Sequence, residues 1–353
     1  LLRQVPATRE RRHRSLEAVV AWSLDQLSPS ARRLFALFSV FAGDVGIEGV
    51  ESVLDHLGFD GRDALDDLSE LQAASLLTGA GGSRFRMLEP IRQLAATELA
   101  ADDRVADARR AHATWISDKL VAANNGGPER AHLFEQLDPE ADHVRAAMEN
   151  IAREGLTELV ADMAIPAGWW FITRDPNRGV ELFEDILRVC DRDADPLTWA
   201  YAVAGWGTTS ASHPVTPRLE EANRALEVLE ANDRPEVGLA RVIAAFSFVQ
   251  AGDRDRPMEL LAEAEELIRT GVDDDPWECA ILDMAFVAFN SLSVTMHFDP
   301  PHDLDEMLVR GDRAAQTFRE LDDRWALGLT LGELGRIRQH LGDLAGAEAC
   351  MLE

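Results

Sequence analysis

From residue 154 onward the sequence repeats one pattern, in which two amphipathic helical segments are joined by a short turn. Helical apolar spacing is found in 157–173 with 178–190, 196–209 with 217–230, and 276–296 with 303–320, and two further units turn at Gly252-Asp253 and Gly342-Asp343. Such a hairpin cannot bury its apolar faces alone, so neighbours must stack. The pattern predicts a mainly α fold, in which four to five hairpins spaced by about 40 residues form a right-handed α-α superhelix over 154–353.

The last unit carries the pattern of a tetratricopeptide repeat. Its defining positions are Leu334, Gly335, Arg338, Gly342, Asp343 and Ala347. The unit around Gly252-Asp253 repeats the scheme with Ala264 at the later packing position, although Pro257 replaces the usual small residue. The units are longer than the standard repeat, so we expect a tetratricopeptide-like array that is truncated at its C-terminus.

The N-terminal region follows a different pattern. Residues 1–14 are basic and without apolar periodicity, which predicts a linker, and 15–27 has the spacing of one helix. Ser28 offers an N-cap oxygen and Pro29 suits the first position of a second helix. The predicted core stripe of that helix is Leu34, Leu37, Phe38 and Phe41, and Gly43 is expected to end it in the left-handed conformation.

Two more helices and a hairpin are predicted next. Residues 45–57 and 62–74 have helical spacing, the second with Leu65, Leu68 and Leu71 toward the core. Short strands are expected at 76–78 and 84–88 around a glycine-rich turn, and a closing helix at 90–101. Helices followed by a hairpin predict a winged-helix domain over 15–104. A helical linker subdomain is expected over 105–153.

The ordered set R-H-x-S-L, W-S-x-x-x-L, R-L-F-x-x-F-S-V-F-A-G and F-R-M-L-E-x-I-R spans residues 12–92. This set resembles the winged-helix region of STAND signal-transduction ATPases of the actinobacterial LuxR/SARP-associated or cyclase-associated regulator type. The resemblance implies a nucleotide-binding domain before the winged helix and a helical repeat array after it. We therefore expect this chain to be part of a longer protein, with its nucleotide-binding domain outside the sequence given.

In that family the start of the last winged-helix helix carries a Met-His-Asp-like triplet, whose histidine senses the bound nucleotide. The matching residues here are Met87, Leu88 and Glu89. The resemblance thus places Glu89 near the nucleotide of the intact parent, but the sensing histidine is replaced by leucine.

The charge pattern argues against nucleic acid and membrane partners. The formal net charge is −28, and residues 1–14 hold five Arg and one Glu, which leaves −32 for 15–353. The helix before the hairpin carries Asp63, Asp66, Asp67 and Glu70 against Arg62, and carboxylates there repel DNA phosphates. The three cysteines are far apart and no long apolar run occurs, which predicts reduced thiols in a cytoplasmic protein.

No catalytic motif is present. The sequence lacks G-x-x-x-x-G-K-[ST], G-x-S-x-G and H-E-x-x-H, so no enzyme activity and no cofactor are expected in this chain, with ATP or ADP only in the intact parent. The sole ligand-like cluster is His297, Asp299, His302 and Asp303. It has no thiolate or third histidine, so a solvated turn is favoured over a metal site.

Aromatic residues fall mainly on the first helix of each pair, and such helices line the concave surface of repeat arrays. We predict a ligand or partner groove at Trp170, Arg174, Trp206 and Phe246, although core packing is the alternative for each aromatic residue. Adjacent Trp169 and Trp170 point about 100° apart, so both are buried only if their helix is enclosed on two sides. The alternative is that one of them faces the groove near Arg174.

Two functions remain open. The first is a regulatory or sensor fragment of a STAND-type ATPase regulator, whose winged helix docks on the nucleotide-binding domain and whose repeats bind an activating ligand or protein. The alternative is an autonomous tetratricopeptide scaffold that binds peptides of other proteins. The basic linker and the incomplete last repeat favour the first.

Overall fold

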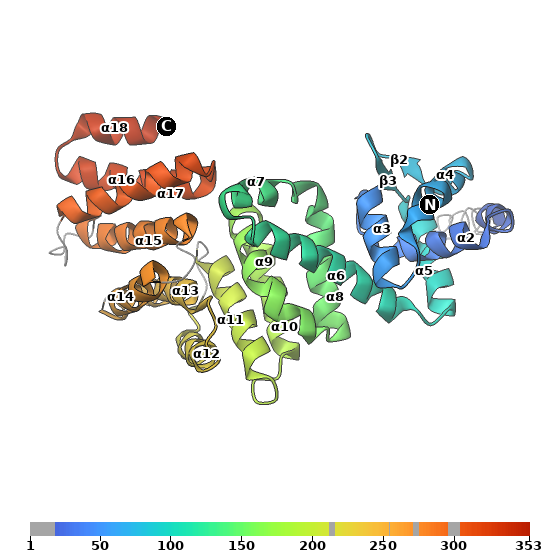
Figure 1. Cartoon of the computed structure of the whole chain (residues 1–353), viewed down its shortest axis with the longest axis horizontal. Coiled ribbons are helices and arrows are strands. Elements are labelled where there is room, and N and C mark those ends of the chain that lie inside the picture. Colours follow the sequence, from blue (N-terminus) through green and yellow to red (C-terminus); the bar gives the residue numbers. More distant parts are fainter. Residues whose placement is uncertain (1–17, 212–215, 254, 271–274, 296–303) are drawn as a thin grey trace, which may run out of the picture. The chain divides into compact units, whose positions relative to one another are not determined.

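A computed structural model describes residues 18–211, 216–253, 255–270, 275–295 and 304–353. Contacts divide the chain into two units, and Figure 1 labels the helices and strands that belong to them. Unit 1 comprises residues up to Asp118 together with Asp138–Leu156, and unit 2 comprises Lys119–Leu137 and Thr157–Glu353. Residues 105–153, expected as a separate linker subdomain, therefore contribute to both units.

Unit 1 begins with the predicted helices. Residues 18–24 are helical, and α2 (Pro29–Leu37) continues as a 3-10 turn, Phe38–Val40. The Ser28 hydroxyl accepts a hydrogen bond from the Ala31 amide at 3.2 Å, and Pro29 occupies the first turn, as the sequence predicts. The predicted stripe from Leu34 to Phe41 is buried.

Gly43 does not end α2 in the left-handed conformation. The helix tightens into the 3-10 turn and leaves it through Phe41, whose backbone is extended (φ −77°, ψ 123°). A 3-10 turn satisfies terminal carbonyl groups by itself, so no left-handed glycine is required. The prediction for this residue was wrong.

A small antiparallel sheet follows. Its strands are β1 (Val45–Gly46), β2 (Thr78–Gly79) and β3 (Arg84–Arg86), in the order β1-β3-β2. The hairpin turn between β2 and β3 uses Gly81 at φ +97° and Gly82 at φ +58°, as expected of glycines. The strand β1 was not predicted, because its two residues were assigned to the helix that follows.

Three helices complete the N-terminal topology: α3 (Ile47–His56), α4 (Ala64–Ala73) and α5 (Glu89–Ala101). In α4 the core residues are Leu68 and Leu71, whereas Leu65 is 53% exposed, contrary to prediction. The α4 carboxylates reach the start of α2, where Glu70 accepts from the Ser28 hydroxyl at 2.7 Å and Asp67 accepts from the Ser30 hydroxyl at 2.7 Å. Two of the acidic side chains of α4 therefore hold this helix against the start of α2 within unit 1.

Unit 1 also contains the first part of α6 (Val105–Asn124) and all of α8 (Ala141–Glu154). Arg84 of β3 forms an ion pair with Glu140 at 2.7 Å, which ties the hairpin to the start of α8. Phe41, His112, Trp115 and His143 pack together, with ring centroids 5.2 to 6.1 Å apart. This cluster joins the N-terminal elements to both helices.

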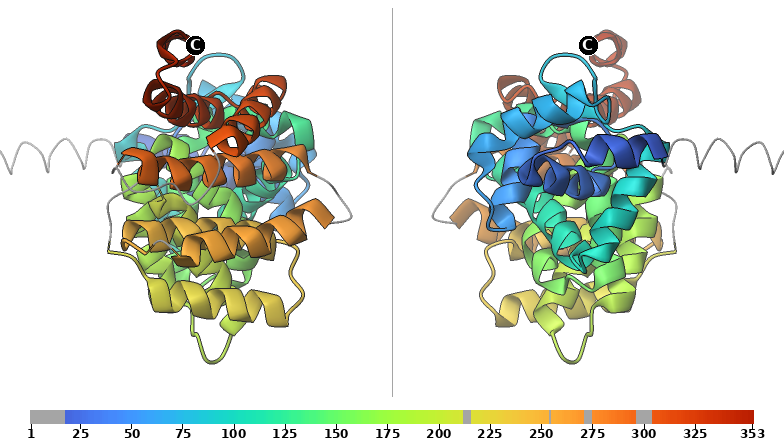
Figure 2. Two further views of the ribbon diagram at one scale, coloured as in Figure 1. Left: turned by 90° about the vertical axis from the view of Figure 1, so that its left-hand side faces the viewer. Right: turned by 90° about the vertical axis from the view of Figure 1, so that its right-hand side faces the viewer.

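Unit 2 is a tetratricopeptide-like array of five helical pairs, preceded by the short α7 (Arg130–Glu135). The pairs are α9 (Val160–Arg174) with α10 (Pro176–Val189), α11 (Pro196–Ser210) with α12 (Leu219–Ala231), α13 (Val237–Gln250) with α14 (Asp255–Thr270), α15 (Pro276–Thr295) with α16 (Leu304–Glu320), and α17 (Arg324–His340) with α18 (Leu344–Leu352). The helices of the later pairs lie stacked in Figure 2. The mainly α superhelix predicted from the repeats is confirmed.

Short sequence signals set the helix ends in unit 2. The Asp175, Asp195, Asp323 and Asp343 carboxylates each accept a hydrogen bond from a backbone amide at the start of the following helix. Gly252 and Gly342 adopt φ of +82° and +80° in their turns, a conformation that favours glycine. Within the array, α9 and α11 approach closely, since a Cβ on Gly205 would lie 2.6 Å from the Ala164 carbonyl oxygen.

Across the described ranges no helix has both the length and the apolar character needed to cross a bilayer. The basic linker at 1–14 and the cluster of His297, Asp299, His302 and Asp303 lie outside the residues that the structure describes.

Candidate ligand-binding cavity

The first helices of all five pairs surround one cavity, which we call the inner cavity. Its volume is about 180 Å³. It is lined by Trp169, Ile172, Thr208, Ala211, Val242, Ile243, Phe246, Met284, Ala288, Trp325, Leu329 and Glu333. Every repeat of the array therefore contributes to the same site.

The lining follows from helix geometry. Each first helix contributes residues three or four positions apart, such as Trp169 and Ile172 on α9 or Met284 and Ala288 on α15. Residues at this spacing share one face of a helix. On α17 the stripe extends over about two turns, from Trp325 through Leu329 to Glu333.

Tryptophan side chains join the first pair to the last two pairs beside the inner cavity. The Trp169 ring lies 5.0 Å from the Trp277 ring and 6.4 Å from the Trp325 ring, both in edge-to-face geometry. The Trp277 indole donates to Asp323 at 2.9 Å. These contacts connect α9 directly with α15 and α17.

Arg130 of α7 reinforces the same junction. Its guanidinium lies 4.3 Å from the centroid of the Trp277 ring and forms an ion pair with Asp275 at 2.9 Å. Burial and the neighbouring Asp275 raise the pKa of Glu278, while Arg130 opposes that rise. The junction is thus held by a largely buried cation between an aromatic ring and a carboxylate.

The wall of the inner cavity offers few polar groups. Its charged side chain is Glu333, which accepts from the Ser291 hydroxyl and forms an ion pair with Arg336 at 2.7 Å. The Thr208 hydroxyl donates to the Ala204 carbonyl oxygen in its own helix. The Trp169 indole N–H is buried and has no acceptor among the described residues.

Of the four predicted groove residues, the structure places Phe246 at the inner cavity, where it packs against Phe289 with ring centroids 4.6 Å apart. Trp170 is 1% exposed and lies outside the cavity wall. Arg174 lies 5.5 Å from the Trp170 ring and donates to the Phe134 carbonyl oxygen at 3.0 Å. These two residues therefore pack together between α9 and α7.

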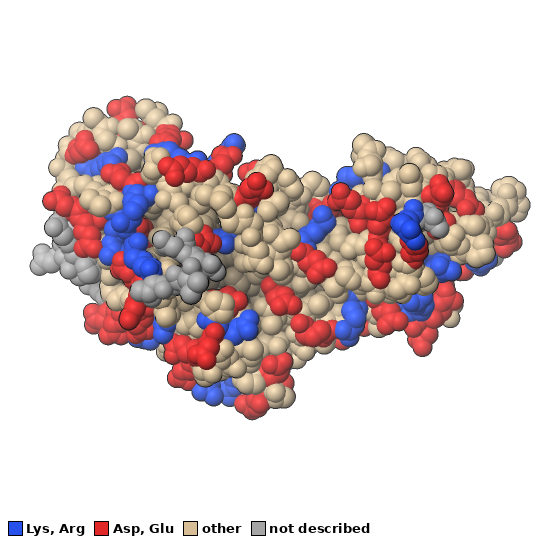
Figure 3. Space-filling model, viewed as in Figure 1, with Lys and Arg blue, Asp and Glu red and all other residues tan. Residues whose placement is uncertain are grey.

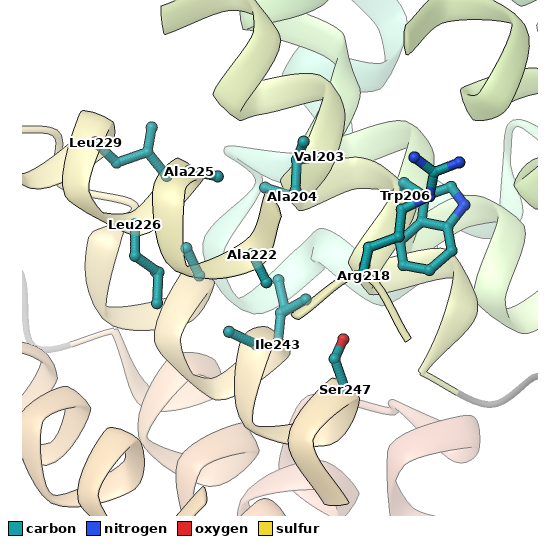
Figure 4. Close-up of a pocket in the computed structure, with 13 residues that line it drawn as sticks. Val203, Ala204, Trp206, Arg218, Ala222, Ala225, Leu226, Leu229, Ile243 and Ser247 are labelled. Carbon is teal, nitrogen blue, oxygen red and sulfur yellow. The ribbon is translucent and has the colours of Figure 1, made fainter. Parts of the chain in front are cut away.

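Trp206 lies at a separate and much smaller pocket of about 20 Å³ between α11, α12 and α13 (Figure 4). It is 3% exposed, and the Arg218 guanidinium lies 5.2 Å from the centroid of its ring. Such a space holds about one water molecule. Trp206 is two residues from Thr208, about 200° around the helix, and so it faces α12 instead of the inner cavity.

The four predicted residues are therefore not brought together. Met284 and Glu333 were missed, whereas Trp169 and Trp325 belong to the aromatic residues expected on first helices but were not selected for the groove. The helices α9, α11, α13 and α15 are apolar around most of their circumference. Their sequences consequently do not distinguish the face toward the cavity from the faces toward other helices. The spacing of Trp325, Leu329 and Glu333 was the available signal, since α17 is more polar.

Glu89, the predicted nucleotide neighbour, is the first residue of α5 and is exposed. It forms an ion pair with Arg92 at 2.6 Å. Hydrogen bonds from Arg92 and then from Gln93 lower the pKa of its carboxyl group. Glu89 is therefore a carboxylate at an accessible helix N-terminus of unit 1.

The described parts of the chain contain few other side chains that could bind a metal ion or act as a nucleophile. Within them, no three His, Cys, Asp or Glu side chains are grouped to hold a metal ion. Cys190, Cys279 and Cys350 are not joined by disulfides among the described residues, and burial raises the pKa of the Cys190 thiol to about 11, which keeps it unreactive. Acidic and basic side chains are spread over the face of the molecule shown in Figure 3.

No protein-family model matches the chain, and no curated protein matches it. Among solved structures, a Signal Transduction ATPase with Numerous Domains (STAND) protein with a tetratricopeptide repeat sensor, from Pyrococcus horikoshii, is similar at a TM-score of 0.38 and 11% identity. The alignment covers 93% of this chain and 57% of that protein, so the chain spans little more than half of that length.

Proposed function

We propose that this chain is the regulatory and sensor part of a STAND-type signalling ATPase. In this proposal unit 2 receives an activating ligand, and unit 1 transmits its presence to the nucleotide-binding domain of the parent protein. The observation that carries the proposal is the inner cavity, because all five repeats contribute to its wall. A ligand there contacts every repeat at once and can change how the repeats pack against one another.

Unit 1 fits the transmitting role in this proposal. The order of its elements, with α3 and α4 followed by the β2-β3 hairpin and a three-stranded sheet, supports a winged helix. Because α4 is acidic and directs Asp67 and Glu70 to the start of α2, we propose that this winged helix docks on protein and does not read DNA. The exposed Glu89 belongs to the surface proposed to face the nucleotide-binding domain in a cytoplasmic parent.

Hydrogen exchange tests the sensor function. A small molecule that raises the melting temperature of the chain is first selected, and amide exchange is then measured with and without it. We expect slower exchange in the first helices of unit 2 and also an altered rate in unit 1, because α6 contributes residues to both units. Slower exchange confined to unit 2 would show a binding module without transmission.

We further propose that the chain has no nucleotide site or ATPase activity of its own, since its sequence lacks a phosphate-binding loop. Titration of the purified chain with Mg-ATP in a calorimeter should give no saturable heat. Saturable binding at micromolar concentration would contradict this part of the proposal. The nucleotide-binding domain of the parent serves as the positive control.

A further inference from the structure

The inner cavity has the size and the apolar wall of a small-molecule site. An empty apolar cavity of about 150 Å³ in another protein binds benzene, so the 180 Å³ of the inner cavity accommodates at least one aromatic ring. Leu329, on its wall, is 45% exposed, which shows that the wall reaches solvent. A ligand can therefore place one ring inside and extend past Leu329.

The charged groups of the cavity wall also determine which net charge of the ligand is favoured. Among the described residues that line the inner cavity there is one carboxylate, Glu333, and no Lys or Arg. An anionic ligand would lose its hydration and would lie near a second negative charge, which costs free energy. Arg336 neutralises part of the Glu333 charge and is itself half exposed, so a cationic ligand gains little. The charge pattern therefore favours an uncharged ligand.

The cavity wall offers too few hydrogen-bond partners for a buried peptide. Each peptide unit brings one donor and one acceptor that need partners when they are buried. The described wall contains no Asn or Gln, its Thr208 hydroxyl already donates within α11, and Glu333 already has two partners. A compact molecule with few polar atoms avoids this cost.

The Trp169 ring adds apolar surface to the wall. Its indole N–H is buried out of reach of a water-sized molecule, so this donor does not open into the inner cavity. A ligand therefore meets the hydrocarbon part of the ring.

We propose that the inner cavity binds an uncharged aromatic small molecule with few polar atoms. This inference rests on the proposed sensor function and specifies the class of its ligand. In this proposal Trp169, Phe246, Met284 and Trp325 enclose the aromatic ring, and Glu333 disfavours anions.

Two naphthalene dyes test this proposal on the full chain. Prodan is uncharged and carries a ketone, whereas anilinonaphthalene sulfonate carries a negative charge on a similar ring system. We expect saturable, blue-shifted Prodan fluorescence, and sulfonate binding weaker by roughly tenfold or more. Equal or tighter binding of the sulfonate would contradict the proposal that the ligand is uncharged.

Substitutions locate the bound dye. Ala288→Trp fills the inner cavity and should abolish Prodan binding, whereas Val309→Trp, on the exposed face of α16, should leave it unchanged. Glu333→Gln removes the negative charge with little change in volume and should strengthen sulfonate binding by roughly fivefold while Prodan binding stays the same. This variant keeps the test decisive if Ala288→Trp does not fold.

The possible failures are distinguishable. If the sulfonate binds tightly and Ala288→Trp abolishes that binding while Prodan does not bind, the ligand class is wrong and the sensor function stands. If the binding of neither dye responds to Ala288→Trp or Glu333→Gln, the inner cavity is not a ligand site, and the proposed function fails with the inference.

Discussion

Replacing Asp283 by Asn is expected to lower the free energy of unfolding of unit 2 by about 3 kcal/mol. Asp283 of α15 is 1% exposed and accepts from Arg269 at 2.7 Å and from Arg313 at 2.7 and 2.9 Å. Arg310 lies 3.7 Å away. The substitution leaves three guanidinium groups from α14 and α16 around an uncharged side chain.

The size of this effect follows from the surroundings of the three arginines. Removing one partner of a buried ion pair typically costs about 3 to 5 kcal/mol. Glu265 pairs with Arg269 and Arg310, and Glu306 pairs with Arg310, so some compensation remains and the lower end of that range applies. Urea unfolding followed by circular dichroism measures the change.

Asp312→Asn is the matched control, because Asp312 pairs with Arg338 at 2.6 Å but is 55% exposed. An exposed pair of this kind contributes about 0.5 kcal/mol, so the unfolding midpoint should barely move. Equal midpoints for Asp283→Asn and Asp312→Asn would show that the three arginines do not depend on Asp283.

Unit 1 is expected to lose stability steeply below pH 6.5. His143 Nε2 donates to the Asp44 carbonyl oxygen at 3.1 Å, and its Nδ1 lies 3.1 Å from His112 Nε2, which we assign as the donor. His112 Nδ1 then remains an unprotonated, buried atom without a partner among the described residues. Protonation there would place a charge where nothing accepts its hydrogen bond.

The pKa shifts give the direction of the effect. Burial, and then the neighbouring His143, lower the pKa of His112 from 6.5 to about 3, and burial lowers the pKa of His143. As pH falls below 6.5 the unfolded chain therefore binds protons that the folded chain does not bind. The stabilisation is complete above pH 6.5 and declines toward pH 3, by up to about 1.4 kcal/mol per pH unit for His112.

Denaturant unfolding at a series of pH values, followed by tryptophan fluorescence, measures this slope. His112→Gln removes one titrating group and should flatten the slope between pH 6.5 and pH 4, even if it lowers stability at pH 7. His340→Gln, at an exposed position of α17, should leave the slope unchanged. A slope that is the same in all three proteins would exclude His112 as its source.

The local sequence determined where most helices begin and end. Ser28-Pro29 starts α2, the carboxylates of Asp175, Asp195 and Asp343 cap later helices, and Gly252 and Gly342 reverse the chain. These signals act within about four residues, so they do not depend on the rest of the fold. The four to five hairpins expected for the array rested on such turns together with the apolar spacing of each segment.

Tertiary structure determined which face of each helix lines the inner cavity and which faces pack against other helices. Trp169, Trp170 and Trp206 look equivalent in sequence, yet only Trp169 reaches the inner cavity, because α9 and α11 are covered on several sides and apolar on all of them. A helix with an apolar surface all round carries no periodic signal of its inner face. The strand β1 likewise exists because β3 pairs with it from 40 residues away. Long-range packing, which no short stretch encodes, therefore placed the candidate site.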